Sequence, residues 1–218
     1  MIRPLCLAII SCSLFAAPVC AQDFLNRFDH FTAEVGAGFS FPAGVHADHL
    51  KTGFNFVASG GPRFNSHFTL TGDFSLHYLN VKRAEQIIDN NAPQVSLGSM
   101  MRMWSLTLNP GYTPIKQERF SLYLTAGYGL YNRRLLLAAP GPIQIDVCDE
   151  FWDVCMKSGP FTKDSVTGNL SIYKGGYNAG GGVTFGSRTK FFIETRYHHM
   201  FTPKAATQVV PITFGIRW

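Results

Sequence analysis

The chain ends with the stretch Val209-Val-Pro-Ile-Thr-Phe-Gly-Ile-Arg-Trp218. Apolar side chains occupy every second position of this stretch, at Val210, Ile212, Phe214, Ile216 and Trp218. Polar or small residues fill most of the positions between them. Because successive side chains of a β-strand point to opposite faces of a sheet, this pattern predicts a strand with one apolar face that ends on an aromatic ring.

The same alternation occurs in seven segments upstream of the last one. They span residues 30–41, 54–64, 67–80, 100–112, 120–133, 171–185 and 191–201. Most of these segments are longer than the ~5–6 residues of an ordinary soluble strand. They match the ~9–11 residues that a tilted strand needs to cross a bilayer, with some extension beyond it. Aromatic residues recur near the segment ends, where the interfacial girdles of a membrane barrel lie.

The connections between the segments differ in length. Those after the second, fourth and sixth segments are short, and those after the first, third and fifth are longer; the last, residues 202–208, is short again. Short periplasmic turns and longer outer loops are typical of outer-membrane barrels. We therefore expect an all-β, eight-stranded antiparallel up-and-down transmembrane β-barrel, with both ends of the mature chain in the periplasm. Ile143, Ile145 and Val147 also alternate, so the longest connection could hold a hairpin or two further strands, which would make ten.

The N-terminus has the features of an export signal. Arg3 precedes an apolar stretch that Pro18 ends, and Val19 and Ala21 place small residues before Gln22. This pattern predicts a Sec signal peptide at residues 1–21 and a barrel domain at residues 22–218. No later apolar run approaches the ~20 residues of a membrane helix.

Removal of residues 1–21 would leave Cys148 and Cys155 as the only cysteines. A single close pair in an exported protein predicts a disulfide, and no second Cys pair or nearby His supports a zinc site. The mature chain would keep 18 of the 19 Lys and Arg residues against 14 Asp and Glu. This mild, unclustered excess gives no reason to expect nucleic acid as a partner.

Several ionisable residues fall on the polar faces of the predicted strands. They are Glu34, Asp73, His77, Glu194, Arg196 and Arg217. The first and the last two segments become neighbours when the sheet closes, so we expect Glu34, Glu194, Arg196 and Arg217 to form one cluster of ion pairs. A buried ion needs a partner, which makes a structural plug the first interpretation. A narrow or gated pore lined by these groups is the alternative.

Residues 211–218 resemble the C-terminal signal that the outer-membrane assembly machinery reads, with Phe214, Ile216 and Trp218 as its apolar positions. Residues 22–218 as a whole resemble the small outer-membrane β-barrel family that includes the OmpA membrane domain and OmpX. The resemblance implies an integral protein of a Gram-negative outer membrane. Its partners would be outer-membrane lipids, lipopolysaccharide and the barrel-assembly machinery.

The resemblance carries no catalytic motif. Outer-membrane lipid A deacylases share the architecture and place a Ser two residues after their His, whereas Met200 and Phe201 stand at those positions after His198 and His199. We therefore predict no catalytic, cofactor-binding or metal-binding residues and a structural or surface-interaction role. A narrow small-solute channel is the alternative, followed by a lipid-modifying enzyme and by a soluble secreted β-protein. Phe151 and Trp152, in the longest connection, are candidates for contact with an unknown surface partner.

Overall fold

The computed structural model describes residues 31–82, 98–138, 147–149, 154–156, 166–187, 189–203 and 205–218. The predicted signal peptide and the candidate contact residues Phe151 and Trp152 lie outside the described residues. Among the residues that are described, no helix is both long and apolar enough to span a membrane.

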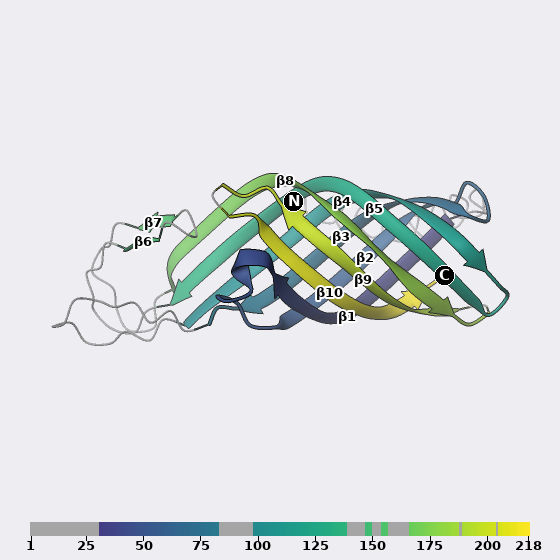
Figure 1. Cartoon of the computed structure of the whole chain (residues 1–218), viewed down its shortest axis with the longest axis horizontal. Helices are drawn as coiled ribbons and strands as arrows, with labels where there is room; N and C mark the ends of the chain where they lie inside the picture. The colour runs from purple at the N-terminus through teal and green to yellow at the C-terminus, as the bar shows by residue number, and fades with distance from the viewer. Residues whose placement is uncertain are drawn as a thin grey trace, which may run out of the picture.

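Eight antiparallel strands close into a barrel in the order β1-β10-β9-β8-β5-β4-β3-β2 (Figure 1). The eight-stranded fold is therefore confirmed, and the last strand pairs with the first from Glu34↔Arg217 to Ala43↔Gln208. The strands are β1 (Phe31–Ala43), β2 (Gly53–Pro62), β3 (Phe68–Asn80), β4 (Gly98–Lys116), β5 (Phe120–Ala138), β8 (Val166–Phe185), β9 (Lys190–Met200) and β10 (Thr207–Arg217).

The connection between β5 and β8 contains a short hairpin rather than two more barrel strands. Its strands, β6 (Val147–Asp149) and β7 (Val154–Met156), form a separate two-stranded sheet. The ten-stranded alternative is therefore wrong. The hairpin register places the backbone of Cys148 opposite that of Cys155. The side chains of this pair lie outside the described residues, so the disulfide stays a prediction.

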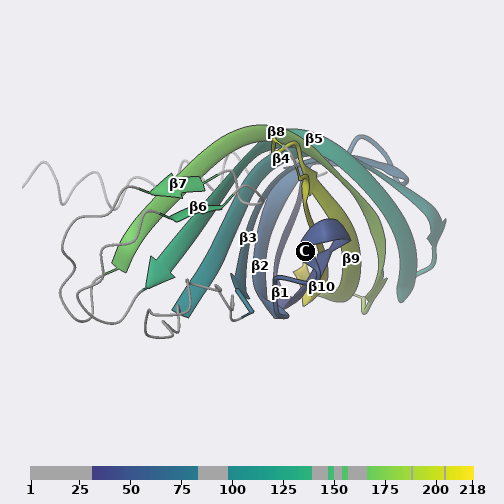
Figure 2. The same cartoon turned by 60° about the vertical axis from the view of Figure 1, so that its left-hand side comes forward.

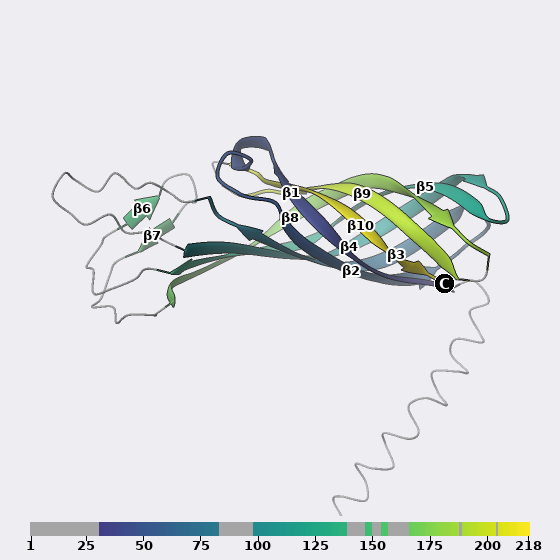
Figure 3. The ribbon, with the colours of Figure 1, turned by 90° about the horizontal axis from the view of Figure 1, so that it is seen from below.

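The barrel has two different ends. At the turn end, short connections join the strands and β1 starts beside the last residue, Trp218, with which Ala33 exchanges two backbone hydrogen bonds of 3.0 Å. At the loop end, a 3-10 helix, η1 (Gly44–His46), follows β1. On one side β5 and β8 continue well past β9, because β8 pairs with β5 along its whole length but with β9 only from Gly176 to Phe185 (Figures 2 and 3).

The side-chain alternation produces a barrel with an apolar outside and a largely polar inside. Large apolar side chains such as Phe39, Leu108 and Phe191 are exposed on the outer wall, whereas polar ones such as Asn109 and Thr213 are buried. This distribution is the reverse of that in a soluble domain and suits a protein surrounded by lipid.

The seam between β1 and β10 is close because glycines face each other there. Gly36 and Gly215 are register partners, and the ring of Phe192, buried in the interior, lies against both. A Cβ atom on Gly215 would stand 2.1 Å from the carbonyl oxygen of Val35. Glycine at this position therefore allows the final strand to close the barrel.

Candidate functional site

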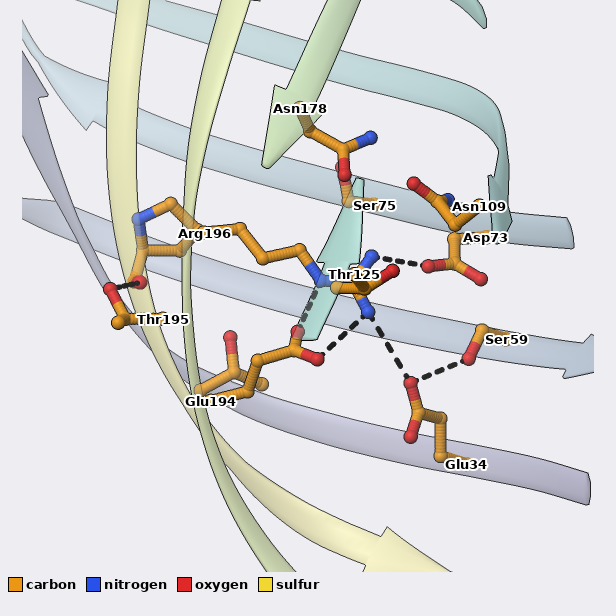
Figure 4. A network of polar contacts seen from close by, with 12 residues as sticks. Glu34, Ser59, Asp73, Ser75, Asn109, Thr125, Asn178, Glu194, Thr195 and Arg196 are labelled. Carbon is orange, nitrogen blue, oxygen red and sulfur yellow. Dashed lines mark hydrogen bonds and ion pairs between the residues drawn. The ribbon is translucent and has the colours of Figure 1, made fainter. Parts of the chain in front are cut away.

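Arg196 lies at the centre of the barrel interior and binds three carboxylates (Figure 4). Its Nη1 donates to Asp73 Oδ2, its Nε lies 2.5 Å from Glu194 Oε1, and its Nη2 donates to Glu194 Oε2 at 2.9 Å. The same Nη2 lies 3.6 Å from Glu34 Oε1. Arg196 is only 5% exposed, and its three partners are no more exposed than it is. A buried charge of this kind is stable only when it is paired.

Arg217 extends the cluster toward the turn end. Its Nε donates to Glu34 Oε2 at 2.6 Å, and its Nη2 lies 2.5 Å from the same oxygen. The guanidinium also lies 3.9 Å from the ring centroid of Tyr123, whose hydroxyl donates to Glu194 at 2.9 Å. Ser59 donates to the other oxygen of Glu34 at 2.7 Å. We call Glu34, Asp73, Glu194, Arg196 and Arg217 the ion-pair cluster.

The ion-pair cluster connects opposite walls of the barrel. Asp73 belongs to β3 and Arg196 to β9, and these strands are separated by three others in either direction around the ring. The structure thus brings together the four residues expected to pair and adds Asp73, which strand adjacency did not predict. An eight-stranded interior is narrow enough for side chains to fill. The cluster therefore closes the lumen at this level.

His77 lies beyond the cluster, toward the loop end, in a second polar layer. Its Nδ1 lies 2.8 Å from Ser40 Oγ and its Nε2 3.1 Å from Ser75 Oγ, while its ring meets that of His198 edge-on with centroids 5.1 Å apart. Both histidines are buried. A cavity of about 10 Å³ between the two layers has roughly the space of one water molecule.

Apolar side chains close the interior at the loop end. They form the apolar cluster of Leu50, Leu79, Met101, Met103, Tyr131, Leu135, Met200 and Val209. Alternation does not predict this cluster, because it implies a polar inner face along every strand. The signal is present, since Met101 and Met103 place apolar side chains on the inner face of a strand that carries Met100 and Trp104 on its outer face.

The helix η1 adds His46 beside the apolar cluster. His46 has no exposed surface, and its Nε2 lies 3.4 Å from Thr207 Oγ1. Burial, together with the charges of Arg133 and His49, lowers the pKa of His46 to about 4. This histidine is therefore neutral at neutral pH.

The other predicted residues lie on the outer wall. Phe214, Ile216 and Trp218 are exposed near the turn end. His199 also faces outward, where it stacks on Tyr177 with ring centroids 4.9 Å apart. Within the described ranges, no group of three or more His, Cys, Asp or Glu residues could hold a metal ion.

Comparisons with known proteins agree with this architecture. Residues 6–216 match the family model described as the outer membrane protein beta-barrel domain. No curated protein matches the chain. Among solved structures, Neisserial surface protein A (NspA) has a TM-score of 0.54 and 14% identity, covering 86% of this chain and 95% of its own.

Two further solved structures have lower scores. Ail of Yersinia pestis has a TM-score of 0.46 and 16% identity, covering 87% of this chain and 98% of its own. OprG of Pseudomonas aeruginosa has a TM-score of 0.46 and 10% identity, and the match covers 87% of this chain and 96% of the OprG chain. At these identities the likeness concerns the fold alone, whereas the family model spans nearly the whole sequence. The chain therefore belongs to the outer membrane protein beta-barrel domain family, as an integral barrel of the outer membrane.

Proposed function

We propose that this barrel neither conducts solutes nor catalyses a reaction, and that it has a structural or surface-interaction role in the outer membrane. The observation that carries the proposal is the double closure of its interior. A solute that entered from the turn end would meet the ion-pair cluster first and the apolar cluster afterwards. To pass, it would have to separate buried ion pairs and then cross a layer that offers few polar groups.

The proposed orientation places the turn end in the periplasm and the loop end outside the cell. Short turns on one side and longer connections on the other support this orientation. Labelling can test it in a Cys148→Ser/Cys155→Ser background. We expect a membrane-impermeant maleimide to label Lys51→Cys on intact cells and to leave Lys116→Cys unlabelled until the outer membrane is permeabilised. The opposite pattern would reverse the orientation.

The long strands on one side of the barrel support a surface role. β4 and β5 each contain 19 residues and β8 contains 20, whereas β9 and β10 contain 11 each. Because ~9–11 residues suffice to cross the bilayer, the remainder of the longer strands extends beyond it at the loop end. In the proposed orientation these strands project a three-stranded sheet away from the cell, where it is accessible to other molecules.

Planar-bilayer recording tests whether the lumen is closed. We expect the purified full-length protein to give no discrete conductance steps. Thr125→Trp places a bulky ring in the lumen, and Leu124→Trp is its control on the outer wall. Both variants should likewise give no discrete conductance steps. Steps in the wild type that Thr125→Trp abolishes and Leu124→Trp preserves would contradict the proposal and favour a channel.

A lipid-modifying enzyme is the competing hypothesis from another class. His198 is buried between the two closures, and Met200 in the apolar cluster stands where a deacylase would carry its Ser. His199 faces the lipid and accepts or donates a 3.1 Å hydrogen bond with Tyr197. We expect mass spectra of lipid A from overexpressing cells to be unchanged. A modified lipid A that disappears in His199→Ala would refute the non-enzymatic proposal.

A further inference from the structure

The interior contains a cavity at the turn end, below the ion-pair cluster. Its volume is about 370 Å³, within the range of ligand pockets of roughly 300–1,000 Å³. Among the described residues, five basic side chains line it, from Arg63, Lys116, Lys190, Arg196 and Arg217. Much of the remaining wall consists of Ser and Thr residues from β1, β3, β4, β5 and β8. We call this cavity the turn-end vestibule.

The turn-end vestibule has an excess of positive charge. Among the described residues that line it, Glu34 has the only acidic side chain, and this carboxylate already binds Arg217 and Arg196. In the part of the chain that the structure describes, Arg63, Lys116 and Lys190 have no ion-pair partner. Among the described residues, three cations without an ion-pair partner therefore surround one cavity.

The fold holds these cations close together in spite of their repulsion. Lys190 and Arg217 are register partners on β9 and β10, so two like charges stand directly opposite each other. Burial, followed by the charge of Arg217, lowers the pKa of Arg63. Like charges opposite each other destabilise a sheet. A bound anion would remove this penalty.

We propose that the turn-end vestibule binds a small, multivalent phosphate compound, such as pyrophosphate or a phosphate monoester. Ammonium and guanidinium groups form strong charge-assisted hydrogen bonds with phosphate oxygens, and the hydroxyl-rich wall offers further donors. The ligand enters from the periplasm, a direction that rests on the proposed orientation. Binding itself depends neither on the orientation nor on the closure of the lumen.

Calorimetric titration of the full-length protein in a neutral detergent, with pyrophosphate at low salt, tests this binding. We expect the double variant Lys116→Gln/Lys190→Gln to bind pyrophosphate about tenfold more weakly or worse, because each substitution removes a charged group that would donate a hydrogen bond to the phosphate. The control is Lys51→Gln/Lys174→Gln, which removes the same charge from exposed residues at the loop end. Its affinity should equal that of the wild type. Slower migration after boiling on a denaturing gel verifies that every variant is folded.

Amide chemical shifts locate the site independently. Pyrophosphate should move the signals of Gly111 and Thr125, which line the vestibule, and leave that of Gly53 at the loop end in place. The proposal is overturned if the wild type does not bind, or if both double variants lose affinity equally. Adding phosphatidylglycerol to the micelles separates a soluble phosphate from a lipid headgroup. An unchanged affinity for pyrophosphate supports a soluble ligand. Weaker binding of pyrophosphate in the presence of the lipid would show that the site takes a lipid headgroup, and would refute the proposal of a soluble ligand.

Discussion

Replacing Arg196 by Met should remove the central cation of the ion-pair cluster while keeping much of its aliphatic volume. The change leaves three buried carboxylates, from Glu34, Asp73 and Glu194, with Arg217 as the one remaining cation of the cluster. Arg217 contacts Glu34, so the other two carboxylates lose their ion pairs. Removing one partner of a buried pair typically costs ~3–5 kcal/mol. We expect the free energy of unfolding to fall by about that amount.

A triple variant separates the loss of pairing from the loss of packing. Arg196→Met/Asp73→Asn/Glu194→Gln removes the cation together with the two carboxylates that depend on it. Because an uncharged replacement of similar shape avoids the desolvation penalty, most of the lost stability should return. The comparison therefore measures the cost of leaving charges unpaired rather than the cost of a cavity.

Reversible urea unfolding of the refolded protein in detergent micelles, followed by tryptophan fluorescence, measures these differences. Lys174→Met, which removes an exposed cation from β8, is the matched control and should behave as the wild type. A loss of less than about 1 kcal/mol in Arg196→Met would show that the pairs contribute little. Failure of the triple variant to recover would show that packing, not charge, dominates.

Three further predictions follow from local contacts. The pKa of His46 is about 4 when folded, below its ordinary 6.5, so its contribution to stability is complete above pH 6.5 and declines as the pH falls toward 4; the protection of the η1 amides, corrected for the pH dependence of intrinsic exchange, should therefore be lower at pH 4.5 than at pH 7.5, and His46→Gln should abolish the difference. Gly215→Ala should impair closure, because its Cβ would stand 2.1 Å from the carbonyl oxygen of Val35; the control Gly72→Ala, whose nearest neighbour is 3.9 Å away, should unfold like the wild type. Deleting Trp218 should reduce the heat-modifiable fraction in the outer membrane, and normal insertion would argue against its role in assembly.

The strands could be predicted from the sequence because a barrel repeats one rule on every strand. Alternation located all eight, and it also placed the first strand beside the last. The lengths of β5 and β8 were underestimated, since residues 134–138 (Arg-Leu-Leu-Leu-Ala) do not alternate and yet pair with β8. Pairing with a neighbouring strand, rather than the polarity of the segment itself, determines where these strands end.

The interior was harder to predict than the wall. Glu34, Glu194, Arg196 and Arg217 could be grouped because their strands are adjacent. Asp73 could not, because its contact with Arg196 depends on the width of the lumen and the reach of an arginine side chain. The turn-end vestibule depends on three separate turns that bring Arg63, Lys116 and Lys190 together. Contacts across a lumen follow from three-dimensional closure and leave little trace in the sequence.

The two closures of the lumen differ in their chemistry, and this difference has a consequence for how the barrel could open. The ion-pair cluster excludes solutes by charge and hydrogen bonding, whereas the apolar cluster excludes water itself. Weakening the ion pairs would admit water from the turn end as far as His77 and His198. It would not hydrate the layer of Met101 and Met200, because that layer offers water few hydrogen-bonding partners. Conduction would require both layers to open together, so a change in only one of them leaves the barrel closed.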